Sequence, residues 1–262
     1  MSNAALHVAR TGLDAQNMRM QVIANNLANV NTTGFKRDRA SFETLAYQAL
    51  TTPGAASSDS TKFATGTNLG TGVQINGTAK IETQGSLQTT DNSLDMAVEG
   101  SGYFQVAMPD GRTGYTRDGN FTLSAEGNIV NSDGYQLQPQ IQIPQGAEKI
   151  TIGTDGTVSA TMPGATETTE VGKIEIATFT NPAGLQSEGN NLLTETASSG
   201  QPQVGPGGID GRGEIRQGAL EASNVNIVEE LVDMIETQRA YEVNSKMISA
   251  TDQMLQYANQ NI

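Results

Sequence analysis

Both ends of the chain repeat apolar residues every seven positions, whereas the stretch between them alternates apolar and polar residues over short runs. Near the N-terminus the repeat consists of two interleaved series, namely Leu6, Leu13, Met20 and Leu27 with Ala9, Gln16, Ile23 and Val30. A seven-residue repeat sustained over four turns predicts a helix that packs against other helices along one seam. We therefore predict a helix from about Asn3 to Val30, which Gly34 helps to end.

The C-terminal repeat is longer and consists of Ile227, Met234, Tyr241, Ile248, Leu255 and Ile262. Asn226 followed by Glu229 resembles a capping box, so we predict a helix over residues 226–259. The alternate seam positions are half polar: Leu231, Gln238, Ser245, Asp252 and Asn259. A dimeric coiled coil prefers apolar residues there, so a helix among several neighbours, with one polar side toward water or a channel, fits better.

The middle of the chain carries the signals of an antiparallel β-meander. From Val73 onward short alternating runs are separated by Asp110-Gly111, Asp118-Gly119 and Asp133-Gly134, which are pairs that favour type I′ hairpin turns. Residues 51–72 have no apolar period and are rich in Thr, Ser, Gly and Ala, which is typical of an extended arm or a linker.

These patterns predict an α+β fold, with long N- and C-terminal α-helices forming a coiled-coil-like assembly layer and a central antiparallel β-rich domain. The parts are an N-terminal assembly helix (1–34), a connecting region (35–94) with an extended arm (about 46–70), a β-rich domain (95–200), a return connector (201–222) and a C-terminal assembly helix (223–262). Within the connecting region, Phe35, Phe42, Leu45 and Leu50 fit either a helical face or an irregular strand.

An alternative is that both helices fold back on the β-body as ordinary core cover. The predicted helices are roughly 42 and 50 Å long, which exceeds what a body of about 120 residues can cover. Their apolar faces therefore favour partners from other copies of the chain. Until those partners arrive, we expect the termini to be poorly ordered, because an isolated amphipathic helix gains little stability.

Composition restricts the classes of partner. The 262 residues carry a net charge of −13 and only 15 basic residues, which argues against a nucleic-acid partner. The one tight basic group, Lys36, Arg37 and Arg39, is typical of a solvated surface. There is no cysteine, no run of 18 apolar residues that predicts a membrane span, and no basic and apolar leader that predicts a cleaved secretory signal.

Candidate chemistry is sparse. His7 is the only histidine and belongs to no motif, and Asp118-Gly119-Asn120 departs from the spacing of a calcium loop. Asp95 and Glu99 are the one carboxylate pair to test for a glycan-cleaving enzyme. We predict no enzyme, and no catalytic, cofactor-binding or metal-binding residue. A secreted β-rich adhesin with helical stalks stays open as a competing class, but it would need a secretory signal.

Longer strings carry a specific resemblance. Residues 24–36, ANNLANVNTTGFK, and residues 217–255, which begin QGALEASNVNIVEELVDM, resemble the N- and C-terminal signatures of the flagellar rod and hook proteins. DMAVEGSGYFQV (95–106) and YTRDGNFTLSAEGNIVNSDGYQLQP (115–139) resemble the central β-region of the same family. Within it, the total length and the segment 46–70 favour a subunit of the distal rod over a hook or proximal-rod paralogue.

The resemblance implies a structural subunit that self-assembles into a helical tube, transmits motor torque across the periplasm to the hook and encloses the export channel. It implies these partners: other copies of the chain, proximal rod proteins and hook protein at the two ends, surrounding P- and L-ring proteins, and the flagellar type III export apparatus. It places the protein in the basal body, exported without a cleaved signal, with residues 46–70 reaching neighbouring subunits to stiffen the tube.

The resemblance and the two repeats together predict an assembly interface. Its members are apolar seam residues and the asparagines and neighbours that surround them: Leu6, Leu13, Met20, Ile23, Asn25, Asn26, Leu27, Asn29, Val30, Asn31, Gly34, Phe35, Asn224, Asn226, Ile227, Leu231, Ile235, Arg239, Tyr241, Asn244, Ile248 and Leu255. We expect the asparagines to satisfy helix ends and polar contacts between subunits.

Overall fold

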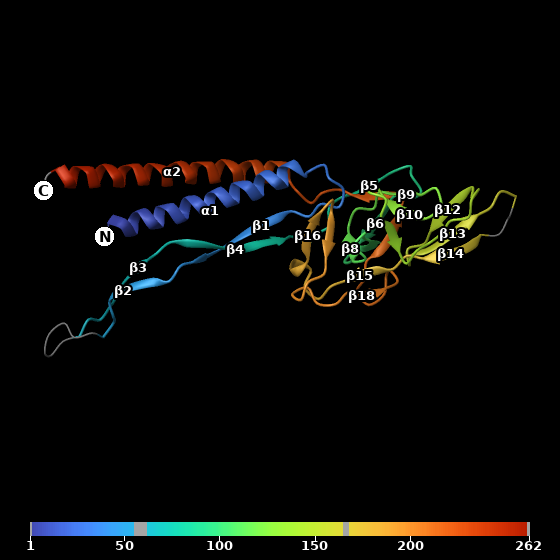
Figure 1. The fold of residues 1–262 in the computed structure, drawn as a ribbon, viewed down its shortest axis with the longest axis horizontal. Coiled ribbons are helices and arrows are strands. Elements are labelled where there is room, and N and C mark those ends of the chain that lie inside the picture. The colour runs from blue at the N-terminus through green and yellow to red at the C-terminus, as the bar shows by residue number, and fades with distance from the viewer. Residues whose placement is uncertain (1, 55–61, 165–167, 261–262) are drawn as a thin grey trace. The chain divides into compact units, whose positions relative to one another are not determined.

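A computed structural model describes residues 2–54, 62–164 and 168–260. The chain divides into two compact units (Figure 1). The first is built from segments within residues 1–27, 38–79 and 227–262, and the second from residues 28–37 and 80–226. Each of these units combines chain segments that are far apart in sequence, so the units do not test the boundaries of the five parts expected from the sequence. Those parts stay predictions.

Two long helices dominate the first unit. Helix α1 spans Ser2–Ala28 and helix α2 spans Ile227–Gln260, each within two residues of the bounds predicted from the sequence. They lie side by side (Figure 1) and run antiparallel, since Asn26 of α1 contacts Glu230 of α2 while Gly12 faces Asn244. Acidic Glu229 and Glu230 occupy the first turn of α2, where the helix dipole favours negative charge.

A β-ribbon completes the first unit. Strand β1 (Asp38–Thr44) pairs with β4 (Val73–Lys80), and β2 (Tyr47–Thr51) pairs antiparallel with β3 (Thr67–Gly70). Between these pairs the Leu45 N–H donates to Gly72 O at 2.9 Å. Phe42 and Leu50 thus lie in strands and not on a helical face. The sequence indicates an extended arm and strands from Val73 onward but not their pairing into a ribbon, because most of the side chains are exposed on both faces and burial imposes no alternation.

The second unit contains the remaining strands and one short 3₁₀ helix, η1. The strands are β5 (Leu87–Thr89), β6 (Met96–Glu99), β7 (Phe104–Ala107), β8 (Thr113–Thr116), β9 (Phe121–Leu123), β10 (Ile129–Asn131), β11 (Gln136–Gln138), β12 (Lys149–Ile152), β13 (Thr157–Thr161), β14 (Thr169–Lys173), β15 (Ile176–Thr178), β16 (Gln186–Gly189), β17 (Leu192–Thr194), β18 (Gln203–Gly205), β19 (Glu214–Gln217) and β20 (Ala219–Glu221), and η1 covers Pro182–Gly184.

Antiparallel pairing organises these strands. The largest sheet has seven strands in the order β16-β17-β8-β7-β11-β10-β9, and a second sheet has the order β12-β13-β14. Two-stranded pairs join β15 to β18, β19 to β6, and β20 to β5. The last two pairs bring the strands that precede α2 against strands from the start of the unit. The expected antiparallel β-rich body is therefore present.

The core of the second unit is apolar and aromatic. Its main cluster includes Met96, Val98 and Ile215, and the rings of Phe104 and Phe121 meet edge to face with centroids 5.4 Å apart. A second, smaller cluster gathers around Phe179, against which Tyr103 and Tyr115 pack edge to face. Apolar burial of this kind is the main stabilising term of the unit.

The Asp-Gly turns differ from the type predicted. A type I′ turn needs positive φ at both central residues. Gly111 and Gly134 have φ of 84° and 85°, but among the described non-glycine residues positive φ occurs only at Asn190, Asn191 and Asp210. The N–H of each of these glycines donates to the carbonyl three residues earlier, at 3.0 Å. These are type I turns followed by a left-handed glycine, which also suit hairpins of right-handed twist.

The type I′ turn lies elsewhere in the chain. Asn190 and Asn191, with φ of 50° and 58°, connect β16 and β17. Asn tolerates the left-handed region better than other side chains because its amide bonds locally. Asp118-Gly119 is not a hairpin turn either: Gly119 O accepts from the N–H of Met96, and the two backbones approach closely there.

Candidate functional site

Helix α1 turns a small-residue side toward its neighbours in the first unit. Ala9, Ala15, Ile23 and Asn26 are its buried residues, and two of them, Ala9 and Ile23, belong to the N-terminal repeat. The hydroxyl of Thr11 contacts the ribbon at Val73 N, at 3.4 Å, and one ring nitrogen of His7 lies 3.1 Å from Thr71 O. The small side chains allow α1 to lie close to both α2 and the ribbon.

Helix α2 meets α1 with a polar stripe. Glu230 and Thr237 are each 1% exposed and, with half-buried Asn244, recur every seven residues. Asn26 anchors one end of the pair: its amide Nδ2 donates to Glu230 Oε2 at 3.3 Å and to Asp38 O at 2.9 Å, and its Oδ1 accepts from Asp38 N at 2.9 Å. One side chain therefore bonds both α2 and the start of β1.

Two further contacts fix the register of the helices. Arg19 donates to Asp233 Oδ1 at 3.3 Å, in an ion pair that water partly reaches. Gly12 faces Asn244 so closely that a Cβ added at position 12 would lie 3.1 Å from Asn244 Nδ2. The missing side chain at position 12 is therefore what lets the helices approach, which accounts for a residue that costs about 1 kcal/mol of helix propensity.

The apolar residues of α2 remain uncovered within the chain. Large apolar side chains between 40% and 75% exposed follow its length: Ile227, Val228, Leu231, Val232, Ile235, Tyr241, Val243, Met247, Met254 and Tyr257. Monomeric proteins rarely expose apolar side chains contiguously over such a length, and such a face marks an interaction surface. We call these ten residues the α2 face.

The predicted interface residues fall into three groups by exposure. Buried are Ile23, Asn26 and Gly34; half-buried are Leu6, Leu13, Met20, Leu27, Asn29, Val30, Phe35, Asn224, Asn244 and Ile248; exposed are Asn25, Asn31, Asn226, Ile227, Leu231, Ile235, Arg239 and Tyr241. Leu255 lies outside the residues whose side chains the structure describes. The seam residues of α1 are thus buried or half-buried, while those at the start of α2 are exposed.

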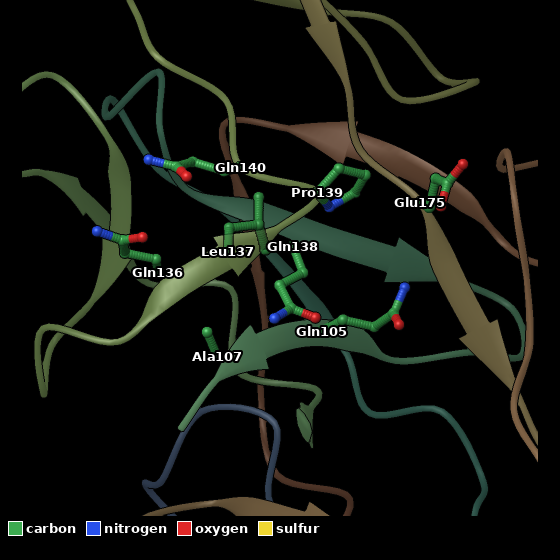
Figure 2. Close-up of a pocket in the computed structure, with 8 residues that line it drawn as sticks. All are labelled: Gln105, Ala107, Gln136, Leu137, Gln138, Pro139, Gln140 and Glu175. Atoms are coloured by element: carbon green, nitrogen blue, oxygen red, sulfur yellow. The ribbon is translucent and has the colours of Figure 1, made fainter. Parts of the chain in front are cut away.

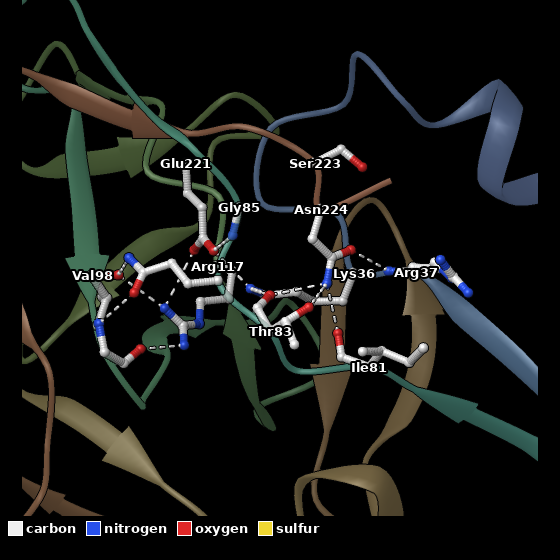
Figure 3. A network of polar contacts seen from close by, with 12 residues as sticks. Lys36, Arg37, Ile81, Thr83, Gly85, Val98, Arg117, Glu221, Ser223 and Asn224 are labelled. Carbon is white, nitrogen blue, oxygen red and sulfur yellow. Dashed lines mark hydrogen bonds and ion pairs between the residues drawn. The ribbon is translucent and has the colours of Figure 1, made fainter. Parts of the chain in front are cut away.

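A buried ion network holds the segment that follows α1 in the second unit (Figure 3). Lys36 Nζ lies 2.7 Å from Glu221 Oε1, and Arg117 donates to Glu221 Oε2 at 3.3 Å. Lys36 also donates to Thr83 O at 2.9 Å, and Arg117 donates to the carbonyls of Val98 and Gly100. The Glu221 carboxylate thus pairs with two cations and also accepts a hydrogen bond from the N–H of Gly85, at 2.9 Å.

Neighbouring contacts extend this network to the approach to α2. Asn224 accepts from Arg37 N at 2.7 Å and donates to the carbonyls of Ile81 and Thr83 at 2.8 and 2.9 Å (Figure 3). Gly34 N donates to Glu221 O at 2.8 Å. The two stretches of chain that flank the helices in sequence, residues 33–37 and 221–224, are therefore bonded directly to each other.

The burial of its charges makes this network sensitive to substitution. Burial lowers the pKa of Lys36, against the hydrogen bond and charge of Glu221, which act to raise it. Two cations share one carboxylate in a site where water is nearly excluded, since the side chains of Lys36 and Glu221 are 3% and 0% exposed. Loss of the carboxylate would leave both cations buried and unpaired, which is a costly arrangement.

The sequence does not reveal this network. It predicts a solvated surface for the tight basic group, which is wrong for Lys36, because that residue is only 4% exposed. Lys36 and Glu221 both belong to the signature strings, but they lie 185 positions apart and no spacing rule links them.

The geometry offers little for catalysis. Asp95 accepts from the side chains of Thr90 and Asn92, whereas Glu99 forms an exposed ion pair with Arg216, so the two carboxylates serve separate structural contacts. A pocket of about 350 Å³ is lined mainly by amides, with Gln105, Gln136, Gln138 and Gln140 opposite Glu175 (Figure 2). Amides neither donate nor accept protons in catalysis at neutral pH. No cluster of metal-ligating side chains occurs in the described part of the chain.

Comparison with known families agrees with the layout of the chain. Residues 6–36 match a model of the flagella basal body rod protein, and residues 97–160 match the flagellar hook protein FlgE/F/G D1 domain. Residues 216–261 match the C-terminal region of the flagellar basal body rod FlgEFG proteins. The first match ends at Lys36 and the third contains Glu221, so the buried ion pair joins two matched regions.

Individual relatives match over nearly the whole length. A flagellar basal-body rod protein FlgG of Buchnera aphidicola (subsp. Schizaphis graminum) is 50% identical over 98% of this chain and 98% of its own. A protein of the same name from Borreliella burgdorferi is 46% identical over 97% of both chains. Another, from Caulobacter vibrioides, is 45% identical over 98% of both.

Proposed function

This chain belongs to the family of flagellar basal-body rod proteins, and from that premise we propose that its copies polymerise into the helical tube of the distal rod. The protein is a structural subunit of the flagellar rod. In the proposed tube the terminal helices form an inner layer around the export channel and the β-body faces outward. Such a tube transmits motor torque to the hook, because a subunit that contacts several neighbours cannot rotate independently of them.

The α2 face carries this proposal. Within the chain, α2 uses Glu230, Thr237 and Asn244 to meet α1 and leaves its large apolar side chains in water. This is the reverse of an ordinary amphipathic helix, which buries its apolar stripe against its own domain. Leu231 and Ile235 are 43% and 50% exposed and one turn apart, so they form a ridge for helices of other copies.

The β-ribbon supports a second contact between subunits. Tyr47 and Leu50 are 62% and 61% exposed, and Phe63 and Leu69 are also exposed. Apolar side chains at this density on a two-stranded ribbon are unfavourable unless a neighbour covers them. We therefore assign the predicted arm, residues 46–70, to contacts with neighbouring subunits that stiffen the rod.

The partners and location follow from the same premise. The proposed partners are proximal rod proteins and hook protein at the ends of the rod, the P- and L-ring proteins around it and the flagellar type III export apparatus. The protein reaches the periplasm without a cleaved signal and acts as a structural element, not as an enzyme. In the described part of the chain, no helix is long and apolar enough to cross a membrane.

Substitution of the α2 face tests the proposal. The variant Leu231→Gln/Ile235→Gln should keep the circular dichroism and thermal midpoint of the wild type and lose the ability to form filaments, measured by sedimentation and electron microscopy. The matched control is Leu123→Gln/Ile209→Gln, which changes two apolar residues of the second unit that are 42% and 52% exposed. Filaments of normal length from the α2 variant would show that this face is not the assembly surface.

Limited proteolysis provides an independent test. Cleavage within α2, residues 227–260, should be faster in dilute monomer than in filaments, because its large apolar side chains are exposed in the single chain. Equal rates in the two states would mean that α2 gains no cover on assembly. The adhesin and enzyme alternatives would then need to be reopened.

The role of the ribbon needs a separate variant. Because Leu45 N already bonds Gly72 O at 2.9 Å, residues 47–70 can be excised and β1 joined to β4 by a short turn. The shortened protein should still form filaments, but with a lower bending stiffness in electron micrographs. An unchanged bending stiffness would rule out the stiffening role and leave the polymer proposal intact.

A further inference from the structure

A small pocket lies beside the buried ion network, entirely within the second unit. Its volume is about 100 Å³. Four segments of the chain line it, with these residues: Glu82, Ser101, Gly102, Tyr103, Arg117, Thr178, Phe179 and Pro182. Arg117 is the residue that it shares with the ion network.

Three polar atoms on the wall of this pocket share one property. Glu82 Oε1, the Tyr103 hydroxyl and Arg117 Nε are buried, and among the described residues none of them has a partner in good hydrogen-bond geometry, although the Glu82 carboxylate approaches the Tyr103 hydroxyl. Tyr103 is 2% exposed and Arg117 is 5% exposed. Buried polar atoms in native proteins nearly always have a partner, from the protein or from ordered water, because leaving one unpaired costs its full desolvation.

The three residues line the same pocket, and the chemistry of the three atoms is complementary. Arg117 Nε–H only donates, the ionised carboxylate of Glu82 only accepts, and the Tyr103 hydroxyl does both. The Arg117 guanidinium lies 5.5 Å from the centre of the Tyr103 ring, so these groups are close neighbours. Burial, followed by the charge of Glu82, raises the pKa of Tyr103, so its hydroxyl keeps its proton and can donate it.

The charges decide between water and an ion. An anion in the pocket would be repelled by Glu82, and a cation would be repelled by Arg117. A neutral molecule that both donates and accepts satisfies all three atoms at once. A volume of about 100 Å³ is ample for at least one water molecule.

We propose that this pocket is a structural hydration site, in which ordered water bridges Glu82 Oε1, the Tyr103 hydroxyl and Arg117 Nε. The bridge extends the ion network from Lys36 and Glu221 through Arg117 to the aromatic cluster around Phe179. It therefore makes Tyr103 a polar anchor of the β-body as well as a packed ring. Glu82, which follows β4 in the chain, gains a fixed partner by the same bridge.

The sign of the stability change in Tyr103→Phe distinguishes a hydroxyl that water bridges from an unpaired one. If Tyr103→Phe removes a hydroxyl that water bridges, the full-length protein should melt about 2–4 °C below the wild type. If the hydroxyl is unpaired, its removal relieves a desolvation cost, and the melting temperature should stay or rise. The matched control is Tyr115→Phe, which packs edge to face on the same Phe179 ring but lies outside the pocket lining.

Crystal structures of the wild type and Tyr103→Phe at a resolution that shows ordered water complete the test. We expect wild-type density within hydrogen-bond distance of all three atoms and weaker or shifted density in the variant. Tyr115→Phe should leave that density unchanged. A dry pocket, an ion or additive in place of water, or a Tyr103→Phe protein as stable as the wild type would each overturn the proposal.

Discussion

Lys36 Nζ and Glu221 Oε1 lie 2.7 Å apart, with both side chains almost completely removed from water. Lys36 follows α1 closely in the chain, and Glu221 closely precedes α2. The pair therefore ties together the two stretches from which the helices depart. In a subunit that carries mechanical load, such a joint must resist opening, and a buried ion pair with additional backbone bonds supplies that resistance.

The first prediction concerns the sharing of one carboxylate by two cations. Glu221→Gln leaves Lys36 and Arg117 buried without an anion, so it should lower the free energy of unfolding of the second unit by about 3–5 kcal/mol. Lys36→Met should cost less, because Glu221 keeps Arg117 as a partner. Denaturant titration followed by the tyrosine circular dichroism of the second unit measures both.

A matched control separates burial from charge. Lys173 and Asp155 form an ion pair at 3.1 Å with side chains 41% and 50% exposed. Lys173→Met should therefore cost less than about 1 kcal/mol. If Lys36→Met lowers the free energy of unfolding more than Glu221→Gln does, the sharing of the Glu221 carboxylate by two cations is contradicted.

The second prediction concerns the backbone beside this pair. Gly34 has φ of 67°, and an added Cβ would lie 2.6 Å from the backbone of Arg117 and of Asp118. Gly34→Ala should thus combine left-handed strain, of order 1–3 kcal/mol, with a clash that flexible atoms cannot relieve. Gly111→Ala is the control: its φ is 84°, but nothing lies within 4 Å of an added Cβ.

The comparison of these two glycine variants isolates the clash. Left-handed strain should lower the stability of both variants. Only Gly34→Ala should unfold at a denaturant concentration markedly lower than that strain explains. Equal losses would mean that the loop can move away from Arg117. The docking of residues 33–37 would then be looser than the contacts indicate.

Repeats revealed the helices, because a seven-residue period is a local signal that requires no knowledge of the fold. The same repeats did not show which side of α2 meets α1. Apolar Leu231 and Ile235 are exposed, whereas polar Glu230 and Thr237 are buried. The reason is that Asn26 and Arg19 of α1 supply polar partners, and only the three-dimensional pairing reveals them.

Burial of charge was the least visible feature in the sequence. Lys36 has the same neighbours in sequence as any surface lysine, and the residue that pairs with it lies in another part of the chain. The strand pairing within the arm also lacked a signal, because strands exposed on both faces have no alternation to detect. Turn chemistry predicted the turns at Asp110-Gly111 and Asp133-Gly134 but gave them the wrong type, and it was wrong at Asp118-Gly119, which is not a hairpin turn.

The third prediction is a pH dependence at Asp118, next to the same loop. Burial raises the pKa of Asp118 above its usual 3.8, although the Thr33 hydroxyl, at 2.8 Å, and the Asn120 N–H act to lower it. The folded state therefore binds this proton more tightly than the unfolded state. Its contribution to stability falls as the pH rises from 3.8 through the raised pKa, and above that pKa the charged form costs stability.

Asp118→Asn keeps both acceptor contacts and removes that charge. The variant should unfold at a higher denaturant concentration than the wild type at pH 7, and the difference should vanish below pH 3.8, where the wild-type carboxyl is protonated in both states. Unfolding curves at several pH values measure it. A difference that does not change with pH would assign the effect to something other than the charge of Asp118.

The fourth prediction tests the close approach of the two helices. At Gly12, an alanine Cβ would lie 3.1 Å from the end of the Asn244 side chain, which can shift by a few tenths of an ångström. Gly12→Ala should therefore recover part of the helix propensity, of about 1 kcal/mol, that glycine loses. Gly12→Leu has a similar propensity but adds three carbons to the contact, so it should fall below the alanine variant by about 1–3 kcal/mol.

The two variants at position 12 separate helix propensity from packing, because they share a site and differ only in volume. Thermal unfolding followed by circular dichroism at the helical band ranks the variants by stability. Ala24→Leu, on an exposed part of α1, controls for the leucine itself. If both variants at position 12 melt together, α1 and α2 are not in close contact in the isolated subunit. Register between the helices would then have to come from neighbouring subunits, and Asn26 with Glu230 would form only within the filament.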